Sequence, residues 1–244
     1  MTPSPPPDAG AGVVSPGVGR ASARRALWQV THAERAALAR DLATLTPDQW
    51  QRPSLCGRWT VEEVVAHLSA AGSIGRWPWI RSMVLAGFRP GVHNQRRLTE
   101  HLGATPAGTL RRFEEVVPLA IAPSSDLPAY LGEVVVHAQD IRRALGIETR
   151  PALDALLPVA RFFVAKNFTV PSRRIASRLR LIATDARFTA GEGPEVCGPL
   201  VALVMCMAGR PDYLRDVTGP GVPLLRARIA GGDGNRGPMP DRAA

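Results

Sequence analysis

Lysine is almost missing from this 244-residue chain: of its 30 basic residues only Lys166 is a lysine, and the others are arginine. The net charge of +9 therefore comes from arginine, in a chain that is also rich in alanine, glycine and proline. This skew is typical of GC-rich codon usage, which raises the isoelectric point without any partner. With two tyrosines and no interleaving of aromatic and basic residues, the sequence lacks a base-stacking pattern. We therefore predict no nucleic-acid partner.

Cysteines and long apolar runs are also scarce. The three cysteines are an odd number without a Cys-x-x-Cys pair, which argues against a disulfide framework and a cysteine-only zinc site. No apolar run reaches the roughly 20 residues of a membrane-spanning helix, and the N-terminus lacks the basic and apolar segments of a secretory signal. We expect a cytoplasmic protein, a monomer or homodimer, with no membrane partner.

Composition divides the chain into four parts. Residues 1–25 and 231–244 are rich in Pro, Gly, Ala and Ser without apolar periodicity, so we expect two disordered tails. Residues 26–170 have helical periodicity throughout and predict a helix bundle. Residues 171–230 mix alternating and helical patterns and predict a small α+β portion, too short for confident independent folding.

Capping patterns give the expected bounds of the helices. Thr31 and Glu34 form a capping-box pattern, which predicts that the first helix begins there, and Thr60 with Glu63 repeats the pattern for the second. An aromatic segment around Trp77 is expected to be helical, and further helices are expected over 106–117, 127–145 and 151–168. The helix over 127–145 is the clearest, with Pro128 in its first turn and Gly146 after its end.

The C-terminal portion is expected to begin with strands. Residues 178–190 alternate apolar and polar side chains, which predicts one or two strands. An apolar helix is expected over 195–208, ending at Gly209, followed by a turn and a short last helix.

One constellation is suited to chemistry. Glu133 and His137 stand four residues apart on the clearest helix, so both side chains lie on one face and can reach one ion. His67, in the middle of the second helix, is a candidate third ligand if the two helices pack together. Two histidines and a glutamate with an open fourth position form a catalytic zinc arrangement. Asp140, one turn beyond His137, is placed to orient its imidazole.

Simpler interpretations exist for each of these residues. A Glu-x-x-x-His pair is often a solvated helix face, and His67 has the pattern of a core histidine. Asp140 has possible partners in Arg142 and Arg143 on its own helix. We expect Cys56 to be a small packed side chain and not a nucleophile.

Three motifs in order add specificity. They are SLCGRWTVEEVVAHL at 54–68, EVVVHAQDIRR at 133–143, and a C-terminal set of ATD at 183–185, GPEV at 193–196, AGR at 208–210 and TGPGVP at 218–223. Together they resemble the mycothiol-dependent maleylpyruvate isomerase family of the DinB-like superfamily, over nearly all of residues 27–229.

The resemblance implies a mainly α fold, a DinB-like four-helix bundle followed by a small α+β C-terminal portion. It implies that His67, Glu133 and His137 bind a divalent metal, usually zinc, and that mycothiol, the low-molecular-weight thiol of actinobacteria, is the cofactor. It also implies a functional arginine near the C-terminus, for which Arg210 is the counterpart, holding a substrate carboxylate. The C-terminal part is shorter than in the isomerase, which leaves the substrate open.

These features predict an enzyme that transfers a thiol to a small electrophile or isomerises it. A divalent metal lowers the pKa of bound water to about 7 and deprotonates a coordinating thiol, so no separate base is needed. Two alternatives remain at this point: a metal-dependent hydrolase that uses the same ligands to activate water, and a non-catalytic binding module with a vestigial site.

Overall fold

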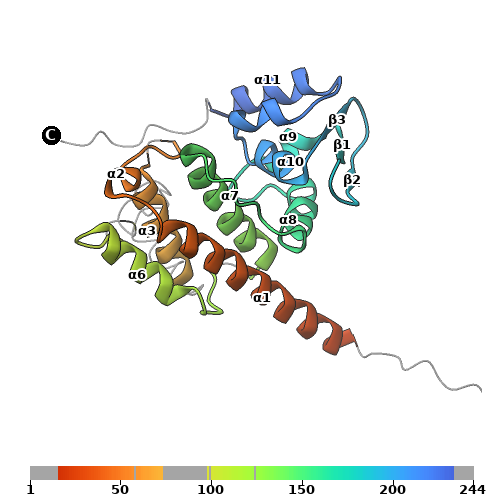
Figure 1. The fold of residues 1–244 in the computed structure, drawn as a ribbon. Helices are drawn as coiled ribbons and strands as arrows, with labels where there is room; N and C mark the ends of the chain where they lie inside the picture. The colour runs from red at the N-terminus through yellow and green to blue at the C-terminus, as the bar shows by residue number, and fades with distance from the viewer. Residues whose placement is uncertain (1–15, 58, 74–97, 99, 124, 234–244) are drawn as a thin grey trace, which may run out of the picture.

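The computed structural model describes residues 16–57, 59–73, 98, 100–123 and 125–233. Four helices form a bundle: α1 (Pro16–Leu42), α3 (Val61–Ser73), α6 (Pro106–Val116) and α7 (Leu127–Leu145). In Figure 1, α1 crosses the front of the bundle and α7 lies between it and the C-terminal portion. The short α2 (Pro47–Trp50) leads into α3. The predicted helix bundle is confirmed, while the predicted helix around Trp77 lies outside the described residues.

The predicted start of the first helix is wrong. Helix α1 begins at Pro16, so the expected tail through residue 25 overlaps it. This N-terminal extension is rich in Ala and Arg, both strong helix formers, and it needs no apolar face because residues 19–26 are exposed. Thr31 is buried inside the helix, where its hydroxyl donates to the Leu27 carbonyl oxygen. Glu34 instead accepts a hydrogen bond from the Ala152 amide, at the start of another helix.

The capping signals of α3 and α7 are confirmed. The Glu63 amide donates to the Thr60 hydroxyl, and the Thr60 amide donates to the Glu63 carboxylate, so two of the free amides at this helix end are satisfied. Helix α7 has Pro128 in its first turn and ends at Gly146, whose φ of 72° is the left-handed conformation that glycine adopts without strain. These two well-bounded helices carry the candidate metal ligands.

The C-terminal portion packs against α7. It contains α9 (Ser172–Ala176), α10 (Leu200–Met207), a 3₁₀ helix η1 (Pro211–Asp216) and α11 (Val222–Asp233). Helix α8 (Leu153–Ala165), which precedes it in the chain, packs on both α7 and α10. Strands β1 (Arg180–Ala183), β2 (Thr189–Ala190) and β3 (Glu195–Gly198) form a sheet in the order β2-β1-β3. Strand β2 pairs with β1 antiparallel, whereas β3 pairs with β1 in parallel, with Leu181 opposite Val196.

The helix expected over 195–208 is therefore two elements. Its first four residues form β3, and α10 begins only after Pro199. The short strand is held by its pairing with β1 and by the close approach of Gly198 to the Asp216 carbonyl oxygen, where a Cβ would lie only 2.7 Å away. Helix α8 is also shorter than expected, and α11 extends to Asp233, three residues into the predicted tail.

The largest core joins the C-terminal portion to the bundle. Buried side chains of α7 and α8 pack with those of β1, β3, α10 and α11 in one cluster, whose fully buried members include Leu131, Val159, Val196 and Leu203. A second cluster lies among α1, α3, α6 and α7. Helix α7 thus contributes to both cores. Its packing on two sides determines how it is rotated about its own axis relative to the C-terminal portion. No helix among the described residues combines the length and the apolar character needed to cross a membrane.

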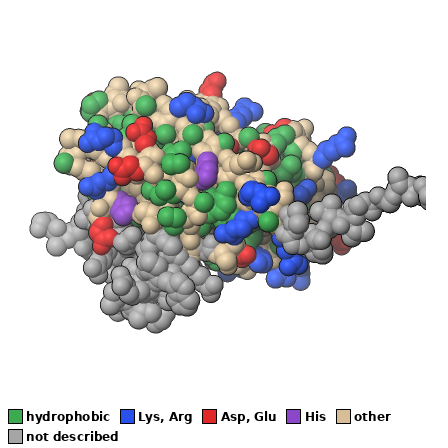
Figure 2. Space-filling view, turned by 90° about the horizontal axis from the view of Figure 1, so that it is seen from below, with side chains coloured by type: hydrophobic (Ala, Val, Ile, Leu, Met, Phe, Trp, Pro, Cys, Tyr) green, Lys and Arg blue, Asp and Glu red, His purple; other side chains and the backbone are tan. Residues whose placement is uncertain are grey.

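The basic side chains are dispersed on the face drawn in Figure 2. Lys and Arg lie there in several groups, separated by hydrophobic, acidic and uncharged side chains. This distribution agrees with the even spread of arginine along the sequence.

We predict that removing residues 1–25 leaves the fold intact. The described side chains of this stretch, residues 19–25, are exposed, so their removal uncovers no core. The melting temperature of the shortened chain is expected to lie within about 2 °C of the full chain, since surface changes alter stability by roughly 0.5 kcal/mol or less. A larger fall, measured by calorimetry, would show that the segment packs on the domain.

Candidate metal centre

Helix α7 carries three polar side chains on one face, of which Glu133 and His137 line a cavity and Asp140 is buried behind them. Glu133 and His137 are one turn apart, and the Glu133 Oε1 atom lies 3.6 Å from His137 Nε2. Asp140 follows on the next turn, with its Oδ2 atom 3.1 Å from His137 Nδ1. With Nδ1 donating to a carboxylate, the Nε2 atom is the one that an imidazole offers to a metal once its own proton has been lost. Asp140 therefore orients the Nε2 atom of His137 toward Glu133.

His67 reaches the same point from α3. Its Nε2 atom lies 2.7 Å from Glu133 Oε1, and the His67 and His137 rings meet edge to face with centroids 5.1 Å apart. The ligand atoms of His67, Glu133 and His137 all lie within 4.8 Å of one another. Packing of α3 on α7 thus brings together residues that are 66 positions apart in the chain.

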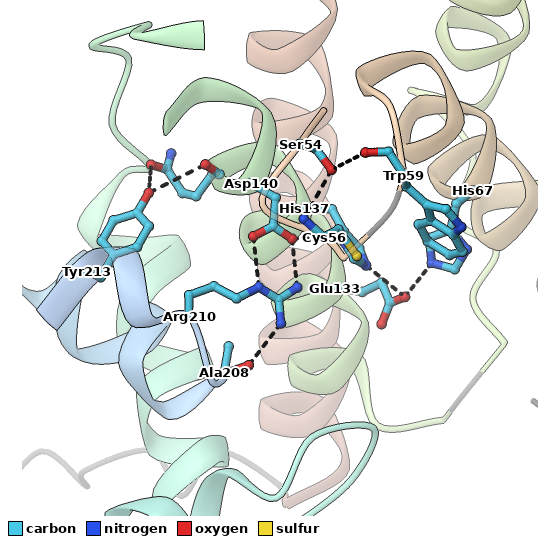
Figure 3. Close-up of polar contacts among 11 residues, drawn as sticks. Ser54, Cys56, Trp59, His67, Glu133, His137, Asp140, Ala208, Arg210 and Tyr213 are labelled. Carbon is cyan, nitrogen blue, oxygen red and sulfur yellow. Dashed lines mark hydrogen bonds and ion pairs between the residues drawn. The ribbon is translucent and has the colours of Figure 1, made fainter. Parts of the chain in front are cut away.

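The loop between α2 and α3 covers this cluster. Its backbone is fixed to α7 by a hydrogen bond from the Leu55 amide to the Asp140 carbonyl oxygen. The Ser54 hydroxyl donates to the Trp59 carbonyl oxygen and accepts from the Cys56 amide, which closes a tight turn. The Trp59 ring then lies 4.9 Å from the His67 ring, between centroids (Figure 3). Aromatic packing on the ligand side chain restricts its rotation.

Arg210 lies directly behind Asp140. Its Nε and Nη2 atoms donate to the two carboxylate oxygens of Asp140 at 2.8 and 2.7 Å, and Nη1 donates to the Ala208 carbonyl oxygen (Figure 3). The Asp140 side chain is fully buried and that of Arg210 is 9% exposed. Neither Arg142 nor Arg143 is the partner of Asp140, since they pair with Asp41 and Asp216. The result is a continuous chain of contacts from Arg210 through Asp140 to His137.

The electrostatics of the cluster favour charged carboxylates. Burial by itself would raise the pKa of Glu133, but hydrogen bonds with His137 and His67 outweigh it and hold that pKa well below its usual range. Burial would likewise raise the pKa of Asp140, and the hydrogen bonds from Arg210 reverse this and lower it. Both carboxylates are therefore anionic near neutral pH.

This donor set fits a divalent cation. Two imidazole nitrogens and one carboxylate converge from two helices, and the side chains of His67 and Glu133 remain 12% and 23% exposed to the cavity. Two histidines with one carboxylate are a zinc-type ligand set that leaves a position for another ligand. The carboxylate behind His137 is the kind of outer partner that metal-binding histidines use.

Cys56 packs against the core, as the sequence predicts, and it also lies at the candidate site. It lines the same cavity of about 210 Å³ as the three candidate ligands, and its sulfur belongs to a cluster with His137 and Asp140. The second position is the one that the sequence did not predict. The only signal in the sequence was its position in the SLCGRWT motif, one turn before the helix of His67.

Comparisons with known proteins match the segment that contains part of this site. Residues 31–79, which include Cys56, Trp59 and His67, match the family model of the mycothiol maleylpyruvate isomerase N-terminal domain. The family resemblance is confirmed. Two uncharacterized proteins of Mycobacterium tuberculosis, from strains CDC 1551 and ATCC 25618, are each 28% identical over 148 residues, which covers 57% of this chain and 76% of theirs.

Solved structures confirm the fold class. The crystal structure of the mycothiol-dependent maleylpyruvate isomerase has a TM-score of 0.56 at 17% identity, and a mutant of that enzyme has 0.57 at 16% identity. Each comparison covers 90% of this chain and 97% of the other. The shared fold thus includes the C-terminal portion as well as the bundle. Because 97% of the other chain is matched, the expected shortening of the C-terminal part is not found.

Proposed function

We propose that this protein is a metal-dependent enzyme that uses mycothiol as cofactor or co-substrate, to transfer the thiol to a small electrophile or to isomerise that electrophile. The observation that carries the proposal is the convergence of His67, Glu133 and His137 on one cavity, in a chain that matches the mycothiol maleylpyruvate isomerase N-terminal family. These three residues would hold a divalent metal, most simply zinc. When bound, the cation supplies the positive charge that deprotonates a coordinating thiol near neutral pH.

The other residues of the site hold the side chains of the candidate ligands in place. Asp140 holds the His137 ring through its Nδ1 atom, and Arg210 holds Asp140 through both carboxylate oxygens. In this proposal both act through His137 and are positioning residues, so Arg210 has a different task from the substrate contact that the sequence resemblance implied. Trp59 keeps the His67 ring in place by direct packing.

Apolar residues line much of the cavity beside the polar groups. Val136, Phe162 and Phe163 line it, together with Gly132, where an added Cβ would lie 3.3 Å from the Phe163 ring. Such a wall excludes water, which would otherwise compete with a thiol for the electrophile. This favours thiol addition over hydrolysis as the reaction of the site.

The test is a thiol titration of the cobalt-substituted protein. Sulfur ligation gives cobalt an intense charge-transfer band in the near ultraviolet, so added mycothiol is expected to produce that band and to release about one proton per site. The titration should use the Cys56→Ala variant beside the wild type, since Cys56 lies in the cavity. A band in both proteins assigns the sulfur to mycothiol.

Two results would contradict the proposal. One is a cobalt spectrum that mycothiol leaves unchanged in both proteins. The other is hydrolysis of an ester or amide without any thiol, which would make the protein a metal-dependent hydrolase. A thiol without the sugar portion of mycothiol is expected to bind more weakly, because only its sulfur would be recognised.

A further inference from the structure

Helices α7 and α8 pack closely at Gly132, which directly precedes the candidate ligand Glu133. A Cβ added to this glycine would lie 3.3 Å from the Cε1 and Cζ atoms of Phe163 and 3.4 Å from Val159 Cγ1. These distances are shorter than the optimum of roughly 3.5–4.0 Å for contacts between carbon atoms. The Phe163 ring therefore lies against α7 because residue 132 has no side chain.

The free space beside the Phe163 ring is the cavity of the metal centre. Phe163 is 5% exposed and belongs to the largest core, together with the fully buried Val159 and Ala160. It also lines the cavity, as Gly132 and Glu133 do. Close-packed interiors leave little other volume for a side chain that is displaced. A ring pushed away from α7 would therefore move into the cavity.

That cavity is small for a ligand site. Its volume is about 210 Å³, below the roughly 300–1,000 Å³ of usual small-molecule sites. A group that is bound at the candidate metal centre has to fit into this volume beside the Phe163 ring. A small displacement of the ring thus changes a large share of the space that such a group can use.

We propose that the contact between Gly132 and Phe163 determines how wide a group the metal centre accepts. The inference rests on the proposed function, which places a divalent metal at His67, Glu133 and His137. A fitted apolar pocket distinguishes ligands that differ by one methylene by about 10–200-fold. The pair therefore selects a slim electrophile, which has no ring and no branched chain next to its reacting atom.

The experiment measures binding of imidazole, 4-methylimidazole and 4-phenylimidazole to the cobalt-substituted full chain. These neutral ligands bind a metal through nitrogen and increase in width, and the visible bands of cobalt report the change in its coordination. Phe163→Leu and Gly132→Ala are compared with wild type. The matched control is Phe113→Leu, because Phe113 is also buried, at 1% exposure, but does not line the cavity.

The two substitutions should act in opposite directions. In wild type we expect 4-phenylimidazole to bind at least about tenfold more weakly than imidazole, and Phe163→Leu to reduce that ratio about tenfold. Gly132→Ala should displace the ring, so that 4-methylimidazole also binds about tenfold more weakly than imidazole. Adding Phe163→Leu to Gly132→Ala should restore binding of 4-methylimidazole, because no ring is left to be displaced.

Several outcomes would overturn this inference. They are equal ratios in wild type and Phe163→Leu, an equal change in Phe163→Leu and Phe113→Leu, and a Gly132→Ala variant that accepts 4-phenylimidazole better than wild type does. Absence of binding of every probe to the cobalt-loaded proteins would also overturn it, since no open position would then be within reach.

The probes contain no sulfur, so the result is separable from the proposed function. If mycothiol gives the cobalt band but the ratios are the same in all variants, the width selection is wrong and the thiol chemistry remains. If the ratios change as expected but mycothiol gives no band, the thiol chemistry is wrong and the width selection remains.

Discussion

A protein that carries both His67→Ala and His137→Ala is expected to be purified without bound divalent metal. The two substitutions remove two of the three candidate donors and leave Glu133 alone, which cannot hold an ion of the zinc type with useful affinity. Loss of only an outer partner of a metal-binding histidine lowers affinity about 10–100-fold. Loss of a ligand itself should exceed that, so each single variant is expected to bind metal at least about a hundredfold more weakly.

The matched control is His32→Ala. His32 lies on α1, where its Nε2 atom is 3.3 Å from the Leu119 carbonyl oxygen, and it does not line the cavity. Elemental analysis should find one metal per chain in wild type and His32→Ala. Full occupancy in the double histidine variant would refute the ligand assignment.

Loss of the metal should lower the free energy of unfolding only modestly. The bundle and the C-terminal portion have extensive cores of their own, unlike a zinc finger, whose folding depends on the metal. The effect on unfolding is then limited to ligand linkage, about 2.7 kcal/mol when free metal is present at a hundred times its dissociation constant. A double variant that is unfolded without metal would contradict this interpretation of the cores.

Local signals in the sequence were enough for the two helices that carry the site. Thr60 and Glu63 determine the start of α3, and Pro128 with Gly146 determines the bounds of α7, because capping and breaking act within a few residues. The four-residue spacing of Glu133 and His137 then places both on one face. Two of the three candidate ligands, Glu133 and His137, could thus be placed without tertiary information.

Other features depend on contacts that no local pattern contains. The four residues of β3 have the local pattern of a helix start. They form a strand because they pair with β1, with Val196 opposite Leu181, and a local pattern does not contain that pairing. The Thr31 and Glu34 pair has the spacing of a capping box. The Glu34 carboxylate, however, accepts a hydrogen bond from the Ala152 amide, which lies more than a hundred residues away. The early start of α1 was missed because Ala and Arg form an exposed helix without apolar periodicity.

The role of Arg210 is the clearest case of this limit. The sequence resemblance implied a substrate contact, and the fold places its guanidinium on Asp140, 70 residues earlier in the chain.

Asp140→Ala is expected to destabilise the protein by about 3–5 kcal/mol, which corresponds to a fall in melting temperature of about 6–20 °C. The substitution removes a fully buried carboxylate and leaves the guanidinium of Arg210, 9% exposed, without its charge partner. It also removes the acceptor for His137 Nδ1, so metal affinity should fall about 10–100-fold. Denaturant unfolding and metal titration measure the two losses separately.

The double variant Asp140→Ala with Arg210→Met distinguishes the two roles of Asp140. Without the buried guanidinium the penalty for an unpaired charge disappears, so the double variant should be more stable than Asp140→Ala alone, with a coupling energy of about 1–3 kcal/mol. Its metal affinity should stay low, because His137 still lacks its orienting carboxylate. Recovery of both properties would contradict a positioning role for Asp140.

Acid titration gives an independent measure of the same pair. Hydrogen bonds from Arg210 lower the pKa of Asp140 in the folded protein, so its contribution to stability is complete above the ordinary carboxyl pKa of about 3.9 and is lost as pH falls through the lowered value. The difference in free energy of unfolding between wild type and Asp140→Asn should therefore be largest near neutral pH and shrink on acidification below about pH 4. A difference that stays constant from pH 7 to pH 3 would mean that the charge of Asp140 contributes nothing, and that its shape alone supports His137.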